Sequence, residues 1–294
     1  MKGEKMHNSS GSDRRGLLKL GTVGLVAAAA VDVQKAAAAA APTSLLRTVL
    51  GRGKLIVGTG STNPPWHFEN ASGKLIGMDI AMAHILAKGL FDDPEKVTFV
   101  QTDPAARIPN ITTGKVDIII QFMTVTAQRG QLVNFSRPYY VEGVALLTLP
   151  KAKIKTFEQL LAGGANSRVS VLINADAENL VHQVLPDAKV MQLDTQANVI
   201  QALESHRVEA ACVDLSTVQW LVKQFSNRYA DSGKHWQHQL YSAAVRQSDL
   251  DWLQYVNTTF NVAMFGNDTA EYDKPFEEYF GDKPPPRHPG FPMI

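Results

Sequence analysis

The stretch RIPNITTGKVDIIIQFMTVTAQRGQLVNFSRPYY, residues 107–140, carries the pattern that decides the fold. It predicts a short helix that ends at Gly114, followed by an apolar strand over 116–122. A second helix is expected directly after Thr126, because threonine is a favourable N-cap residue. Short apolar strands that alternate with helices in this way favour an α/β fold with a largely parallel sheet.

The same alternation extends to both sides of this stretch and predicts two α/β units. Strands are expected at 54–59, 96–101 and 116–122, then at 143–149, 168–173, 189–193, 208–214 and 240–246. Helices are expected at 76–90, 107–114, 156–163, 177–185, 195–206, 215–225 and 248–264. The chain therefore reads as two lobes with a ligand cleft between them. Lobe 1 would comprise 43–142 and 240–294, and lobe 2 would comprise 143–239.

Arg129 lies in the first turn of the helix that Thr126 is expected to cap. The N-terminus of a helix carries partial positive charge, so a cation there costs about 0.3–1 kcal/mol. A bound anion would make this position of the arginine favourable, because free backbone N–H groups and the guanidinium would both point at it. The position of Arg129 therefore predicts a site for an anionic group.

Asp214 supplies a charge of the opposite sign at the end of another predicted strand. In open α/β sheets, ligands bind beyond the carboxyl ends of the strands, where 121–124 and Asp214 are both expected. Arg129 and Asp214 could thus face each other across the cleft, which suits a zwitterionic ligand. Asp214 could also cap the helix 215–225, and the two roles are compatible.

Composition excludes several classes of function. The 294 residues carry a net charge of +1, which gives no indication of nucleic-acid binding. Cys212 is the only cysteine, so an internal disulfide and a cysteine-rich zinc site are excluded. The eight histidines show no metal-ligand spacing. We therefore expect neither a metal nor another cofactor.

Residues 1–42 are expected to be an export signal and not part of the fold. Arg14 and Arg15 precede an apolar run over 21–30, and a second alanine run ends at Pro42. This order of basic, apolar and small residues is typical of a cleaved signal, and the paired arginines resemble a twin-arginine signal. A permanent membrane anchor is the alternative. Either reading predicts a protein outside the cytoplasm, and the cleaved signal predicts a periplasmic one.

Three segments resemble the family 3 extracellular solute-binding proteins, the polar amino-acid receptors of ABC importers. They are NPPWHFENASGKLIGMDIAMAHILA (63–87), residues 107–140 as quoted above, and GGANSRVSVLINADAEN (163–179). The resemblance extends from about 46 to 281. It implies a type II periplasmic-binding-protein fold, a free amino acid as ligand and a membrane ABC permease as partner. It also implies a protein without catalytic activity, and we expect a monomer.

The resemblance also implies roles for four residues that bind the main-chain groups of an amino acid. Arg129 would hold the α-carboxylate in a bidentate pair, and Thr124 would donate to it from its hydroxyl or amide. Asp214 would bind the α-ammonium. The backbone carbonyl of Phe122 would accept a further ammonium hydrogen, at a position where the family usually has glycine or serine.

Two further candidates lie where this sequence departs from the family pattern. Asn63 replaces an aromatic residue that stacks on the ligand side chain in many members, and Gly60 replaces an acidic residue. Both changes weaken the case for a lysine, arginine or histidine receptor. Asp176, in the loop 172–177, would return a negative charge near the ligand side chain, or it would only cap the helix 177–185.

Two other functions are compatible with the same scaffold. Periplasmic cyclohexadienyl dehydratases resemble this family and also hold a carboxylate with an arginine, but they need an acid positioned for proton transfer. The sequence offers Asp176 or His67 for that role. A periplasmic sensor module is the third reading, and it would have to act through a separate protein.

Overall fold

The computed structural model describes residues 44–174, 176–281 and 283–287. The expectations about an export signal at 1–42 concern residues outside these ranges. Within the described ranges, no helix combines the length and the apolar character needed to cross a membrane.

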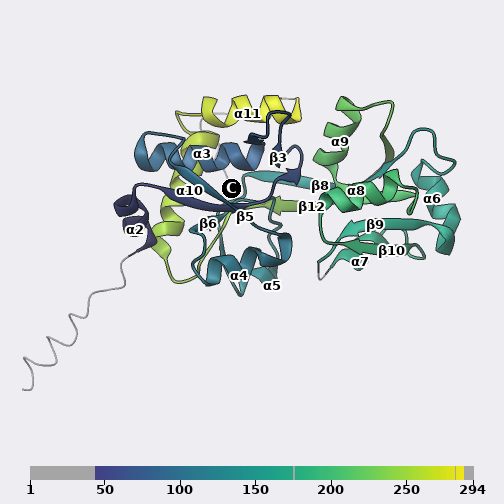
Figure 1. Ribbon diagram of the computed structural model, residues 1–294, viewed down its shortest axis with the longest axis horizontal. Coiled ribbons are helices and arrows are strands. Elements are labelled where there is room, and N and C mark those ends of the chain that lie inside the picture. The colour runs from purple at the N-terminus through teal and green to yellow at the C-terminus, as the bar shows by residue number, and fades with distance from the viewer. Residues whose placement is uncertain (1–43, 175, 282, 288–294) are drawn as a thin grey trace, which may run out of the picture. The chain divides into compact units, whose positions relative to one another are not determined.

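The first part of the described chain builds one five-stranded sheet and the helices on it (Figure 1). Its strands are β1 (Leu55–Thr59), β5 (Val97–Gln101), β6 (Ile118–Ile119), β7 (Asn134–Phe135) and, from the end of the chain, β13 (Ala244–Val245). Its helices are α2 (Leu45–Arg52), α3 (Met78–Phe91), α4 (Arg107–Thr112), α5 (Ala127–Gly130), α10 (Leu250–Phe265) and α11 (Ala270–Phe280). A small sheet of β2 (Thr62–Asn63), β3 (His67–Glu69) and β4 (Leu75–Ile76) lies between β1 and α3 in the sequence.

The middle of the chain builds a second five-stranded sheet. Its strands are β8 (Tyr140–Thr148), β9 (Arg168–Leu172), β10 (Lys189–Leu193), β11 (Ala210–Asp214) and β12 (Ala230–Tyr241). Its helices are α6 (Phe157–Gly163), α7 (Ala177–His182), α8 (Gln196–Glu204) and α9 (Leu215–Gln224). Two 3-10 turns, η1 (Pro104–Ala106) and η2 (Gly164–Asn166), precede α4 and follow α6.

The two sheets have the same topology. The first has the order β5-β1-β6-β13-β7 and the second the order β10-β9-β11-β8-β12. In each, the first three strands are parallel to one another, the fourth is antiparallel, and the fifth is antiparallel to the fourth. Four strands of each sheet therefore run in one direction, which confirms the expected α/β class with mainly parallel sheets. We call the first sheet with its helices lobe 1 and the second lobe 2.

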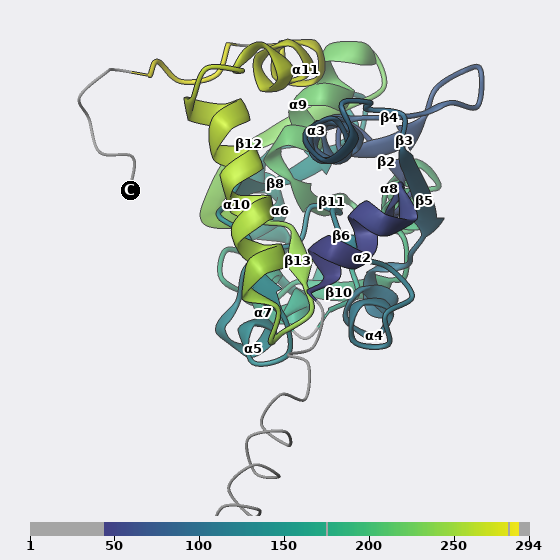
Figure 2. The same cartoon turned by 90° about the vertical axis from the view of Figure 1, so that its left-hand side faces the viewer.

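Both faces of each sheet are buried, as the apolar strands predict. In lobe 1, Ile118 and Ile120 pack with α3 and α10, while Ile119 packs on the opposite face with Ile111 of α4. Figure 2 shows α3 and α11 on one side of the strands and α4 and α5 on the other. In lobe 2, alternate residues of β8 face α6 and α7 or face α8 and α9.

The strands β8 and β12 connect the lobes. They pair antiparallel from Ala230↔Thr148 to Tyr241↔Tyr140, and Thr124 of lobe 1 forms a further β-bridge to Tyr241. The expected lobe boundaries, 142/143 and 239/240, fall inside these two strands. The division into 43–142 with 240–294 and 143–239 stays a prediction.

The largest corrections to the expected elements concern two strands. The strand placed at 240–246 begins ten residues earlier, and β12 and β13 are separate strands in different sheets. Polar residues such as Lys234 and Gln239 interrupt the apolar pattern from which a strand is predicted. The strand is stabilised by its pairing with β8 instead. The strand placed at 116–122 is only Ile118–Ile119, although its side chains are buried as expected.

Candidate ligand-binding site

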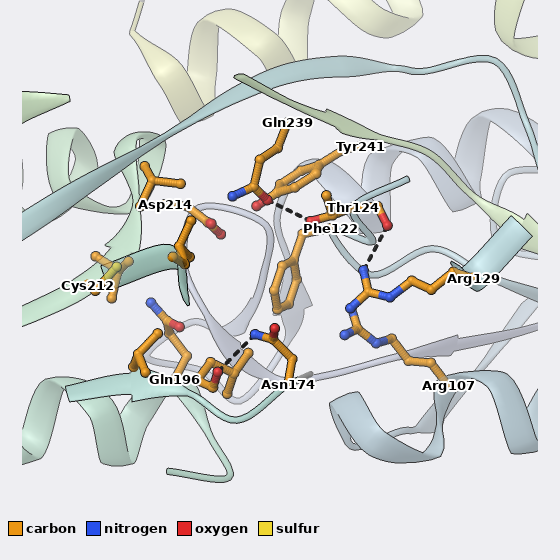
Figure 3. Close-up of a pocket in the computed structure, with 15 residues that line it drawn as sticks. Arg107, Phe122, Thr124, Arg129, Asn174, Gln196, Cys212, Asp214, Gln239 and Tyr241 are labelled. Atoms are coloured by element: carbon orange, nitrogen blue, oxygen red, sulfur yellow. Dashed lines mark hydrogen bonds between the residues drawn. The ribbon is translucent and has the colours of Figure 1, made fainter. Parts of the chain in front are cut away.

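One pocket lies where the carboxyl ends of strands from both lobes meet (Figure 3). It encloses about 520 Å³ of space free of protein atoms, part of it open to solvent. Its charged lining residues are Arg107, Arg129 and Asp214. Its polar lining residues are Thr124, Asn174, Gln196, Gln239 and Tyr241.

Arg129 lies in the short helix α5, whose N-cap is Thr126 as the sequence predicts. The Thr126 hydroxyl accepts a hydrogen bond from the Arg129 backbone N–H at 3.2 Å. The Arg129 guanidinium turns back into the pocket, where Nη1 donates to the Thr124 carbonyl at 2.7 Å. Burial lowers the pKa of Arg129, and the charge of Asp176 partly offsets this. A bound anion would stabilise this desolvated cation.

Asp214 ends β11 and lines the opposite side of the pocket (Figure 3). Asp214 occupies the N-cap position of α9 as expected, but its side chain makes no capping hydrogen bond. Burial raises the pKa of Asp214 to about 6, and a hydrogen bond from the Tyr241 hydroxyl and the charge of Arg107 act in the opposite direction. Near neutral pH the group is a partly buried carboxylate that a ligand cation would stabilise.

Thr124 and Phe122 lie between the two charged sides. The Thr124 hydroxyl donates to Oε1 of Gln239 at 2.7 Å. Phe122 has φ of 34°, in the left-handed region that glycine adopts more easily, and its backbone N–H donates to Asp79 at 2.9 Å. Its ring stacks on His67, with ring centroids 4.8 Å apart. The aromatic ring is therefore held as part of the pocket wall.

Asn63 and Asp176 do not line this pocket. Asn63 is buried in β2, and neither polar atom of its side chain has a hydrogen-bond partner among the described residues. Asp176 is exposed at the N-cap position of α7, where its side chain makes no capping bond. Its negative charge nevertheless acts on Arg129.

Sequence reasoning missed five polar lining residues, namely Arg107, Asn174, Gln196, Gln239 and Tyr241. Arg107 opens α4 and Gln196 opens α8, and each helix follows the edge strand at the same end of its sheet. Arg107 follows a predicted strand, and this position could have indicated that it lines the pocket. Gln239 and Tyr241 reach the pocket only because β12 pairs with β8, which no local pattern shows.

A buried hydrogen-bond chain joins the lobes beside the pocket. Trp66 Nε1 donates to Ser216 Oγ at 2.9 Å, and that hydroxyl donates to Glu142 at 2.5 Å. Thr217 also donates to the Pro64 carbonyl at 3.2 Å. Burial and the charge of Asp214 raise the pKa of Glu142 to about 8. The Trp66 loop of lobe 1 is thus fixed to the start of α9 in lobe 2.

The described residues contain no group of three or more histidine, cysteine, aspartate or glutamate side chains that could hold a metal ion. Cys212 is buried in β11, and burial raises its thiol pKa. The lining instead offers hydrogen-bond donors on one side and a carboxylate on the other. This arrangement can bind and orient a small zwitterion.

Comparison with known proteins identifies the family to which the chain belongs. Residues 55–282 match the bacterial extracellular solute-binding proteins, family 3, and the chain belongs to that family. It is 25% identical to the ABC transporter glutamine-binding protein GlnH of Bacillus subtilis over 81% of this chain and 85% of the relative. It is 28% identical to the L-cystine-binding protein TcyJ of Escherichia coli K12, over 83% of this chain and 88% of the relative.

A solved structure resembles the whole two-lobed fold. The ancestral amino acid-binding protein AncCDT-1, described as a precursor of cyclohexadienyl dehydratase, superimposes with a TM-score of 0.71. It is 31% identical in sequence and matches 81% of this chain and 100% of its own. This similarity confirms the expected fold class.

Proposed function

We propose that this protein captures a free amino acid in the pocket between its lobes and delivers it to an ABC-type importer. The observation that carries the proposal is the placement of Arg129 and Asp214 on opposite sides of one pocket. Arg129 would bind the α-carboxylate, with Thr124 as a second donor. Asp214 would bind the α-ammonium, with the Phe122 carbonyl as a second acceptor. Asn63 and Asp176 would act from outside the pocket lining.

Each lobe supplies one half of this site, so the ligand would favour the arrangement in which both halves contact it. The protein with bound ligand would then dock on a membrane permease. We further propose that the protein acts as a monomer in the periplasm, after export through a twin-arginine-type signal that is then cleaved. The names of the relatives and the family assignment support this location and partner.

A thermal-shift screen of the purified protein against the common amino acids tests the proposal. A ligand at a hundred times its Kd adds about 2.7 kcal/mol of stability, a shift of several degrees for a protein of this size. We expect a shift with one class of amino acid, and its loss in Arg129→Ala. No shift with any amino acid would contradict the proposal.

A dehydratase on the same scaffold is the second candidate. One observation favours it, namely the similarity to a structure described as a precursor of such an enzyme, although that structure is itself described as amino acid-binding. Asp176 is exposed outside the pocket and His67 is bonded to Asp79, so neither is placed to transfer a proton to a ligand. Turnover of prephenate or arogenate would decide for the enzyme.

A further inference from the structure

A second arginine, Arg107, is buried in the wall of the pocket beside Arg129 (Figure 3). It is 6% exposed. Its Nε donates to the Pro104 carbonyl at 2.9 Å and its Nη1 to the Gln121 carbonyl at 3.2 Å. A guanidinium has five N–H donors, so these two backbone contacts leave donors available to the pocket.

No carboxylate within the ranges 44–174, 176–281 and 283–287 forms an ion pair with Arg107 or Arg129. Burial and the charge of Arg129 lower the pKa of Arg107 to about 10. The group therefore stays charged at neutral pH and is desolvated. A buried charge without a counterion is costly, and an anionic ligand group would relieve that cost.

The neighbouring acids do not balance this second cation. Asp79 receives hydrogen bonds from the Phe122 backbone and the Tyr139 hydroxyl and pairs with His67, away from the pocket lining. Glu142 is bonded to Ser216 and also lies outside the lining. Asp176 is exposed, so solvent screens its charge.

The pocket lining thus carries two cations and one anion. A zwitterion whose carboxylate meets Arg129 and whose ammonium meets Asp214 leaves Arg107 without a partner. Gln196 adds another donor, because its Nε2 is buried without a hydrogen-bond partner among the described residues. A second carboxylate on the ligand would give Arg107 a counterion.

We propose that the pocket selects amino acids with an acidic side chain and that Arg107 binds the side-chain carboxylate. This inference rests on the proposed function, since it assigns Arg129 and Asp214 to the main-chain groups. Arg107 is the specificity residue because the Phe122 ring and two backbone carbonyls fix its position. Its guanidinium carbon lies 5.6 Å from the centre of that ring.

Calorimetric titration of the purified protein with two ligand pairs tests the inference without any substitution. Glutamate and glutamine, like aspartate and asparagine, differ by a carboxylate against an amide of nearly the same shape. We expect at least one acid to bind tenfold or more tightly than its amide. Equal or tighter binding of both amides would overturn the inference and leave the proposed function intact. No binding of any of the four would overturn the inference, and the thermal-shift screen against the other amino acids would then decide the proposed function.

Arg107→Leu then tests the assigned residue, with Arg47→Leu on the exposed face of α2 as the matched control. We expect Arg107→Leu to lose about a hundredfold in affinity for the acid and to bring the ratio of acid to amide affinity close to one. An equal loss for acid and amide would show that Arg107 acts on a shared group or on the fold, and would overturn its role.

Arg107→Lys is a second variant that keeps the test valid if Arg107→Leu does not fold. It keeps the positive charge and removes the planar guanidinium group. We expect its acid-to-amide ratio to lie between those of the parent and Arg107→Leu, at a melting temperature near that of the parent. A ratio unchanged from the parent in both variants would contradict the assignment.

Discussion

The two lobes share one strand order and place opposite charges at equivalent points. The third strand in lobe 1 is β6, which leads to Thr124 and Arg129, and the third strand in lobe 2 is β11, which ends at Asp214. The helix after the edge strand begins with Arg107 in lobe 1 and with Gln196 in lobe 2. A repeated scaffold thus presents donors on one side and an acceptor on the other.

The backbone topology therefore fixes where a ligand can bind, while a few side chains fix which ligand it can be. Carboxyl ends of parallel strands meet at one edge in both lobes, so any residue there can reach a ligand. The assignment of cations to lobe 1 and of Asp214 to lobe 2 gives the pocket its polarity.

The largest expected effect follows from removing the main cation of lobe 1. Arg129→Ala should weaken ligand binding by about 2–5 kcal/mol, roughly thirtyfold or more, because a desolvated carboxylate loses its charged partner. Titration calorimetry with the preferred ligand measures this loss. Arg47→Ala, at an exposed position on α2, is the control and should bind like the parent. Unchanged affinity of Arg129→Ala would show that lobe 1 does not hold the carboxylate.

The matching change in lobe 2 is Asp214→Asn, which removes the anion and keeps the shape. We expect a loss of about 1.5–3 kcal/mol for the amino acid, the usual contribution of a hydrogen bond to a charged group. An analogue of the same ligand without its ammonium should bind parent and variant alike. If that analogue lost as much affinity as the amino acid, Asp214 would not be the ammonium partner.

The link between the lobes can be broken at Ser216. Ser216→Ala leaves the buried N–H of Trp66 without its acceptor, which should destabilise the fold by about 1–3 kcal/mol. Urea denaturation measures the change, with Ser205→Ala on the surface of lobe 2 as the control. Equal stabilities for Ser216→Ala and the parent would show that this chain of hydrogen bonds does not hold the lobes together.

The smallest expected effect is a pH dependence of the ligand affinity, which arises from Asp214 in lobe 2. Burial raises the pKa of Asp214 to about 6, and an ammonium binds only the ionised carboxylate. Affinity should therefore fall as the pH drops from 7 through 6, approaching about tenfold per pH unit. Titrations between pH 5 and 8 measure the profile. Asp214→Asn should flatten it, and a parent profile already flat to pH 5 would refute this titration.

Local patterns in the sequence predicted most elements of both lobes. Thr126 caps α5 and Thr156 forms a capping box at the start of α6, because capping needs only residues three positions apart. The strand β10 was predicted with its bounds. Elements that are stabilised by pairing with distant parts of the chain were harder to predict. The polar strand β12 owes its form to pairing with β8, and β2 with Asn63 belongs to a small sheet hidden in a proline-rich turn.

The residues of the candidate site also form two groups, those that local patterns predict and those that distant segments bring together. The α/β class, the family resemblance and four pocket residues could be predicted from the sequence. These residues are Phe122, Thr124, Arg129 and Asp214. These residues follow strand ends, and a strand end is visible in a local apolar pattern. Only the tertiary structure decided that Arg107 and Gln196 join them and that Asn63 and Asp176 lie outside the lining. Such placements depend on how distant segments pack, and no single stretch of the chain encodes that packing.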